Sequence, residues 1–174
     1  QKSIMRDTPW GRMSYLDYKY KVEFEKFEYD QIDQYCKARD IHWSASPWDL
    51  DSLKFLSQYD IPFIKIPSAL LTDIELIKES TKTGKKIIIS TGMSTLEEID
   101  NAVNAILGVN SNANYAILHC NSSYPAPSNE LNLKCIETLK NKYNCEVGYS
   151  GHEFGLTTTI ASICLGATII ERHI

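Results

Sequence analysis

Two histidines that each follow a short apolar run are the first candidates for chemistry in this sequence. His152 ends the segment Glu146-Val-Gly-Tyr-Ser-Gly-His152, and His173 ends the segment Thr168-Ile-Ile-Glu-Arg-His173. About twenty residues separate them, which suits a strand, a crossover helix and a second parallel strand. Because parallel neighbours end side by side, we predict that the two imidazoles meet at one mouth as a metal site. The alternative for each histidine is an ordinary hydrogen-bonded residue at a strand end.

The composition is typical of a soluble globular protein. The chain has 174 residues, of which 43% are hydrophobic and 23% charged, enough for one ordinary domain with a core. A net charge of −4 with mixed signs gives no support for binding nucleic acid or an anionic membrane. No apolar run approaches the ~20 residues of a membrane span, and the first residues contain no signal-peptide hydrophobic region. We therefore expect neither a nucleic acid nor a membrane as partner.

The cysteines indicate a reducing compartment. There are five, an odd and widely spread set without a Cys-x-x-Cys pair, which argues against a disulfide framework or a thiolate zinc site. Reduced thiols in a cytoplasm are the expected state. The cysteines are Cys36, Cys120, Cys135, Cys145 and Cys164.

Six short apolar runs alternate with helix-like segments along the chain. Such alternation predicts a parallel α/β architecture, and Thr72-x-x-Glu75 and Ser94-x-x-Glu97 are predicted capping boxes for two of the helices. Before residue 29 we predict a turn at Thr8-Pro-Trp-Gly11 and then a surface loop or poorly anchored helix over Met13–Phe27. The six strands are centred near Trp43, Ile64, Ile88, Ile117, Val147 and Ile169, and other helices are expected over Tyr29–Arg39, Asp51–Tyr59, Leu133–Tyr143 and Leu156–Leu165.

The ends of these strands favour a (β/α)8 barrel over an open doubly wound sheet. Glycine-rich phosphate motifs are absent, which weakens the nucleotide-binding alternatives. Each strand also ends in polar or reactive residues, as in barrel enzymes, whose active sites lie at the carboxyl rim. A barrel needs eight strands and typically ~250 residues, so this chain is two strands short. The strand-end residues are Ser44 and Ser46, Lys65 and Ser68, Ser90 and Thr91, His119 and Asn121, Ser150 and His152, Glu171 and His173.

Five short motifs follow one another along the chain. They are Lys65-Ile-Pro-Ser68, Ile89-Ser-Thr-Gly-Met93, Leu118-His-Cys-Asn-Ser-Ser-Tyr-Pro125, Gly148-Tyr-Ser-Gly-His152 and Glu171-Arg-His173. In this order they resemble the sialic acid synthase family, whose members make nine-carbon 2-keto acids such as N-acetylneuraminate, legionaminate and pseudaminate. The resemblance extends from about residue 8 to the last residue.

The resemblance implies a fold class and a domain organisation. Residues 1–174 are expected to form an incomplete TIM-barrel catalytic domain, equivalent to strands three to eight of a (β/α)8 barrel. The family's first two strands and its carboxyl-terminal antifreeze-like domain have no counterpart in this sequence. We therefore expect a piece of a longer cytoplasmic synthase that is inactive by itself, with a homodimer for the full-length protein.

The resemblance also implies a reaction and a metal. The family condenses phosphoenolpyruvate with an open-chain N-acyl hexosamine of the N-acetylmannosamine type and releases phosphate. A divalent ion, manganese with magnesium or cobalt as alternatives, activates the sugar aldehyde as a Lewis acid. The positions that match the metal ligands are His152 and His173. Glu171 either orients these ligands or forms a salt bridge under the barrel rim.

A phosphoenolpyruvate pocket needs a fixed cation and several hydroxyl or amide donors. Tyr124 matches the sugar-side tyrosine of the family and is expected, with Lys65, His152 and His173, among the catalytic residues. At the position of Ser122 many members have asparagine, and serine is the smaller group with one donor fewer. The positions that match the phosphoenolpyruvate site are Ser46, Lys65, Ser68, Ser90, Ser122 and Ser150.

Two other functions are compatible with these residues. A Schiff-base aldolase would use Lys65 as the nucleophile, but it leaves the two histidines unexplained. A non-catalytic partial barrel would bind only phosphate or metal. Which hexosamine is the acceptor is left open, since much of the sugar pocket would come from other segments of such a barrel.

Overall fold

The computed structural model describes residues 4–174 and divides the chain into two compact units, Gln1–Trp43 and Ser44–Ile174. The first unit opens with a hairpin whose two-residue loop confirms the predicted turn. Thr8 Oγ1 donates to the carbonyl oxygen of Gly11 at 2.6 Å, and Gly11 has a φ of +94°, which glycine adopts without steric cost. The elements of this unit are β1 (Met5–Thr8), β2 (Gly11–Ser14), α1 (Tyr15–Val22) and α2 (Lys26–Ala38).

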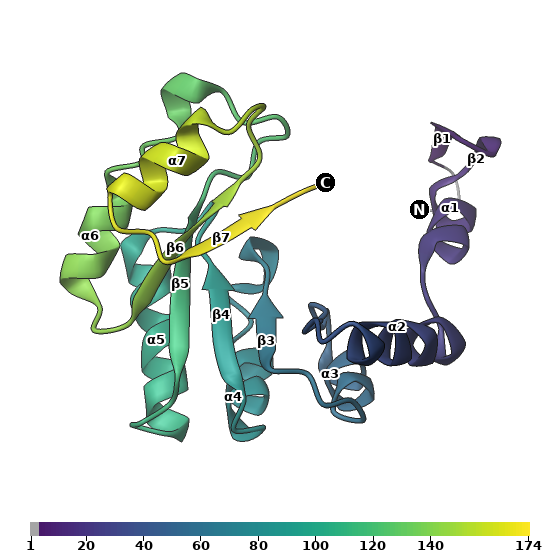
Figure 1. Cartoon of the computed structure of the whole chain (residues 1–174), viewed down its shortest axis with the longest axis horizontal. Coiled ribbons are helices and arrows are strands. Elements are labelled where there is room, and N and C mark those ends of the chain that lie inside the picture. The colour runs from purple at the N-terminus through teal and green to yellow at the C-terminus, as the bar shows by residue number, and fades with distance from the viewer. Residues whose placement is uncertain (1–3) are drawn as a thin grey trace. The chain divides into compact units, whose positions relative to one another are not determined.

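The second unit is built on a five-stranded parallel sheet. The strands lie side by side in chain order, and the helices follow the outer side of the curved sheet (Figure 1). This is the predicted partial barrel. Its strands are β3 (Phe63–Ile66), β4 (Lys86–Ser90), β5 (Tyr115–Cys120), β6 (Glu146–Gly151) and β7 (Ile169–Arg172). Its helices are α3 (Leu50–Leu56), α4 (Ile74–Lys82), α5 (Leu96–Val109), α6 (Cys135–Lys142) and α7 (Thr157–Cys164), with 3-10 turns η1 (Ser68–Leu70) and η2 (Ser128–Glu130).

The sixth expected strand, near Trp43, was wrong. Residues 41–47 have no strand structure, and they make no ladder with β3 within the described part of the chain. A side chain supplies the contact instead, because Ser44 Oγ donates to the carbonyl oxygen of Phe63 at 2.7 Å. Ser44 therefore contacts β3 without the backbone pairing that defines a strand.

The capping box predicted for α4 does not form, and the one predicted for α5 was placed one residue too early. The N-cap of α4 is Asp73, whose side chain accepts from the backbone of Leu76, and not Thr72. The capping box of α5 joins Thr95 and Glu98, not Ser94 and Glu97. Since hydroxyl and carboxylate residues stand side by side at both places, spacing alone could not separate the alternatives.

The strand interiors alternate between two environments. Ile88, Ala116 and Leu118 form one buried cluster on the inner face, with Phe63 and Ile169 packed against it. The residues between them, such as Ile87 and Ile89 in β4, point to the opposite side of the sheet, toward the helices. Because of this alternation, every second residue of a strand faces inward. The last inward residue of each strand therefore lies at the carboxyl mouth of the sheet.

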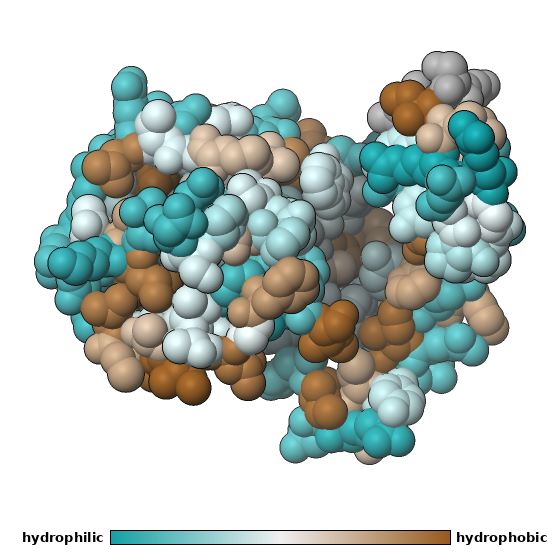
Figure 2. All heavy atoms as spheres, turned by 90° about the horizontal axis from the view of Figure 1, so that it is seen from above, coloured by the Kyte–Doolittle hydropathy of each residue, from teal (hydrophilic) through white to brown (hydrophobic). Residues whose placement is uncertain are grey.

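The surface mixes apolar and polar residues, with brown patches on both units (Figure 2). None of the helices within residues 4–174 combines the length and the hydropathy that crossing a bilayer requires. All five cysteines lie in this described part of the chain and carry free thiols.

Gly148 in β6 allows the neighbouring strand β7 to approach closely. A Cβ atom at this position would lie 2.4 Å from the carbonyl oxygen of Ile169 and 2.5 Å from Cδ2 of Leu118. The first of these contacts is to backbone, so the strands themselves would have to move.

We predict that Gly148→Ala lowers the free energy of unfolding by about 1–3 kcal/mol, because overpacking strains a rigid interior. Gly108→Ala, in α5, is the matched control, since nothing lies within 4 Å of its added methyl group. That change should be neutral or stabilise by up to about 1 kcal/mol. Urea denaturation followed by circular dichroism measures both, and equal stabilities for the two variants would contradict the prediction.

Candidate active site at the strand ends

A cavity of about 450 Å³ opens at the carboxyl ends of the five strands. Each strand contributes to it through its last inward-facing residues, as the pleat requires. All nine residues that the resemblance assigns to catalysis, metal binding or phosphoenolpyruvate binding line this one cavity. They are Ser46, Lys65, Ser68, Ser90, Ser122, Tyr124, Ser150, His152 and His173.

The two histidines converge on one point. Nε2 of His152 lies 2.7 Å from the hydroxyl of Tyr124, and Nε2 of His173 lies 3.2 Å from the same oxygen. Nδ1 of His152 lies 2.6 Å from the carbonyl oxygen of Asn121. A carbonyl can only accept, so Nδ1 carries the hydrogen and Nε2 presents a lone pair, the form in which imidazole binds a metal.

The parallel register between β6 and β7 explains this convergence. Ser150 is paired with Glu171, so the residues two positions further along, His152 and His173, face the same side at neighbouring places. Their ring centroids are 5.2 Å apart. Tyr124 comes from the loop after β5 and stacks on the His152 ring at 3.9 Å.

Lys65 is the buried cation of the cavity, with 8% of its surface exposed. Its Nζ donates to Ser90 Oγ at 2.8 Å and lies 3.4 Å from Oε2 of Glu171. Ser150 Oγ donates to the other oxygen of this carboxylate at 2.7 Å. Burial lowers the pKa of Lys65 below its usual value, and the charge and hydrogen bond of Glu171 oppose that shift.

Gly92 lies between two hydroxyls of the cavity wall, and no role for it was predicted from the sequence. Its amide donates to Ser68 Oγ at 3.0 Å. A Cβ atom at this position would lie 2.8 Å from that oxygen and 2.1 Å from Ser122 Oγ. Only glycine leaves both hydroxyls in place, and its position directly after Ser90-Thr91 at a strand end was the available signal.

The donor set fits a divalent transition metal only in part. Two imidazole nitrogens pointing at one oxygen are a suitable pair of ligands. Among residues 4–174, however, no three His, Cys, Asp or Glu side chains lie close enough together to hold an ion. An ion bound here would take its remaining ligands from water, from a substrate or from other protein segments.

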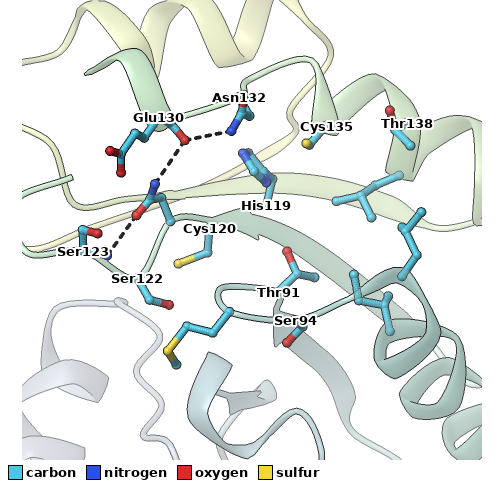
Figure 3. Close-up of a pocket in the computed structure, with 15 residues that line it drawn as sticks. Thr91, Ser94, His119, Cys120, Ser122, Ser123, Glu130, Asn132, Cys135 and Thr138 are labelled. Atoms are coloured by element: carbon cyan, nitrogen blue, oxygen red, sulfur yellow. Dashed lines mark hydrogen bonds between the residues drawn. The ribbon is translucent and has the colours of Figure 1, made fainter. Parts of the chain in front are cut away.

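A larger cavity, of about 600 Å³, lies on the helix side of the same strand ends (Figure 3). It shares Met93, Cys120 and Ser122 with the mouth. The side chains of His119 and Cys120 leave β5 on opposite sides (Figure 3), and His119 Nε2 donates to the carbonyl oxygen of Leu131 at 2.6 Å. Burial lowers the pKa of His119. This imidazole is a neutral anchor for the loop after β5, and the groups suited to chemistry lie in the smaller cavity.

Comparison with known proteins identifies one family over the whole length of the chain. The model of the NeuB family matches residues 1–174. The N-acetylneuraminate-9-phosphate synthase of Drosophila melanogaster is 36% identical over 99% of this chain, and the N,N'-diacetyllegionaminic acid synthase of Campylobacter jejuni is 37% identical over 88%. A crystal structure of the N-acetylneuraminic acid synthetase from Leptospira borgpetersenii matches 87% of this chain with a TM-score of 0.83 and 32% sequence identity.

These matches show that the chain belongs to the NeuB family, as the sequence motifs predicted. The chain spans 46% of the length of each of the two curated relatives and 53% of the Leptospira chain. The shared part is the curved parallel sheet with its outer helices, a TIM-barrel type of fold.

The contacts of Lys65 give a testable titration. We predict that Glu171→Gln lowers the pKa of Lys65 further, because the amide keeps the shape of the side chain but removes the charge that favours the ammonium form. Glu146→Gln is the control, since Glu146 pairs with Lys86 and not with Lys65. NMR titration of the lysine Cε and Nζ signals measures the shift. An unchanged or raised pKa in Glu171→Gln would show that the carboxylate does not stabilise the ammonium ion.

Proposed function

We propose that this chain forms part of the active site of a synthase that condenses phosphoenolpyruvate with an open-chain N-acyl hexosamine. In this reaction a carbon–carbon bond forms between C3 of phosphoenolpyruvate and the aldehyde carbon. One water is consumed, phosphate leaves, and a nine-carbon 2-keto acid results. The observation that carries the proposal is the convergence of His152 and His173 beside a buried Lys65, in a chain of the NeuB family.

The metal side of the site consists of the two histidines. Their Nε2 atoms would hold a divalent ion, for which the family resemblance implies manganese, with magnesium or cobalt as alternatives. When bound, such an ion polarises the aldehyde oxygen and makes the carbonyl carbon electrophilic, which the weak carbon nucleophile of phosphoenolpyruvate requires. With the two histidines bound to an ion, the hydroxyl of Tyr124 would be free to donate a hydrogen bond to the sugar.

The phosphoenolpyruvate side consists of one cation and a set of small donors. Lys65 offers a fixed charge to the phosphate or carboxylate group, and hydrogen bonds to charged groups are among the strong ones. The hydroxyl groups around it are those of Ser46, Ser68, Ser90, Ser122 and Ser150, all on the cavity wall. Glu171 on β7 holds Ser150 on the adjacent strand β6 and Lys65 on the opposite edge strand β3.

A Schiff-base aldolase is the second candidate, because burial lowers the pKa of Lys65 and so favours a neutral amine. The proximity of Glu171 argues against it, since a carboxylate 3.4 Å away stabilises the ammonium form. Borohydride trapping with pyruvate separates the two functions. A covalent adduct on Lys65 supports the aldolase, and its absence at saturating pyruvate supports the synthase.

We predict that manganese binds this chain and that His152→Ala or His173→Ala each weakens the binding at least about 10-fold, because each removes one of two protein ligands. Isothermal titration calorimetry measures the affinity. His42→Ala is the control, since His42 is exposed and belongs to the other unit. Tight binding that both site substitutions leave unchanged would place the ion elsewhere and refute the metal assignment.

We also predict that Lys65→Met weakens phosphoenolpyruvate binding about 10- to 100-fold, since a hydrogen bond to a charged group contributes ~1.5–3 kcal/mol. Lys54→Met, on the exposed side of α3, should leave binding unchanged. Ligand-observed ³¹P NMR follows both variants. Equal affinities for the two would remove Lys65 from the phosphate site.

A further inference from the structure

The outer side of β6 and β7 holds a charged cluster behind the two histidines. Glu153 follows His152 directly and Arg172 precedes His173 directly, so each histidine is covalently joined to one member of an ion pair. Glu153 is 4% exposed and does not line the mouth. The side chains of Tyr149, Glu153 and Arg172 are called the clamp below.

Arg172 ties the end of β7 to the loop that follows β6. Its Nη1 donates to a carboxylate oxygen of Glu153 and to Thr159 Oγ1, the latter at 3.2 Å. Its Nη2 donates to the backbone carbonyl oxygens of Glu153 at 2.6 Å and Gly155 at 3.1 Å. Arg172 also borders the mouth, but these four contacts from its guanidinium all go to residues of the loop and the first turns of α7.

The carboxylate of Glu153 is fully engaged. It accepts from the hydroxyl of Tyr149 at 2.8 Å and from Thr158 Oγ1, in addition to Arg172. Burial alone would raise the pKa of Glu153, but the hydrogen bonds it accepts outweigh burial and lower the pKa below its usual value. A buried charge with such partners stabilises one geometry, and removal of a partner leaves the other charge unpaired.

Gly151 gives the clamp its space. A Cβ atom at Gly151 would lie 2.7 Å from Nη1 of Arg172 and 2.8 Å from Oε2 of Glu153. Gly151 is paired with Arg172 in the sheet, so the ion pair lies directly over the last ladder position of both strands.

The backbone ladder ends at that position. β6 ends at Gly151 and β7 at Arg172, one residue before each histidine. The strand hydrogen bonds therefore do not extend to His152 or His173. The contacts that continue across the gap between the two strand ends on the outer side are those of the clamp.

We propose that Glu153 and Arg172 are positioning residues that fix the distance between His152 and His173. The expected effect on metal affinity rests on the proposed function. If the two imidazoles are already fixed, binding of one ion does not include the free-energy cost of ordering the two strand ends. Partners that orient metal ligands typically change metal affinity 10–100-fold when they are substituted.

The test compares Glu153→Gln and Arg172→Lys with Glu146→Gln, a control at the other end of β6. Manganese titration calorimetry should show about 10-fold or greater weakening in Glu153→Gln and Arg172→Lys, and no change in Glu146→Gln. A double-mutant cycle with His173→Ala separates positioning from general stability. If the clamp acts through the pair, Glu153→Gln has little further effect once His173 is gone. Additive losses would instead overturn the inference.

A second readout needs no metal. The ring centroids of His152 and His173 lie 5.2 Å apart, so nuclear Overhauser contacts between their ring protons are expected in the unsubstituted chain. These contacts should persist in Glu146→Gln and weaken or disappear in Glu153→Gln and Arg172→Lys. Contacts that persist in both clamp variants would refute positioning. If manganese fails to bind at the histidines, the proposed function loses its metal while this measurement still decides the clamp.

Should Glu153→Gln unfold, Thr159→Val offers a milder change, since it removes a single acceptor of Arg172. It should weaken the ring contacts and manganese binding in the same direction but less. Circular dichroism of each variant establishes that the sheet is intact. A folded Thr159→Val or Arg172→Lys variant with unchanged ring contacts and unchanged manganese affinity would contradict the inference.

Discussion

The parallel register between β6 and β7 is the constraint on which the rest of the site depends. It pairs Ser150 with Glu171 and Gly151 with Arg172. Because alternate residues face opposite sides of a strand, this one register builds two surfaces at once. The inward surface holds the carboxylate and the histidines, and the outward surface holds the ion pair. A shift of β7 by one residue would turn its inward side chains outward and its outward side chains inward, and neither surface would form.

A continuous chain of polar contacts crosses the inner side of the sheet. It runs from Ser90 on β4 to Lys65 on β3, then to Glu171 on β7 and back to Ser150 on β6. Placing a cation in an apolar interior costs free energy, and the carboxylate offsets part of that cost. The result is a set of hydroxyl groups and one charge whose positions are determined before any ligand arrives, which is the condition for recognising a small anion.

The sequence predicted the sheet and the residues of the mouth because both follow from local periodicity. Apolar runs separated by helix-length segments defined β3 to β7, and the polar residue at the end of each run marked the rim. The strand near Trp43 failed for a non-local reason, since strand structure needs a partner ladder that an apolar run cannot guarantee. The hairpin of β1 and β2 was missed beyond its turn, because its strands are short and exposed and carry no alternating pattern.

Other parts of the site lay beyond sequence reasoning because they depend on close approach in space. Gly92 is required by two hydroxyl groups from different loops, a contact invisible along the chain. The partnership of Glu153 and Arg172 joins residues nineteen positions apart. Their opposite charges beside the two histidines were a signal, but only the strand register shows that they meet.

The hydroxyl of Tyr124 has a single hydrogen to share between two imidazoles. The shorter contact, 2.7 Å to His152, takes that hydrogen, because Nδ1 of His152 already donates to Asn121 and its Nε2 must accept. His173, at 3.2 Å, then meets the phenol as a donor through its own Nε2–H. The two rings are thus unequal partners. His152 already presents a lone pair at Nε2, whereas His173 would have to carry its hydrogen on Nδ1 before its Nε2 could act as a ligand.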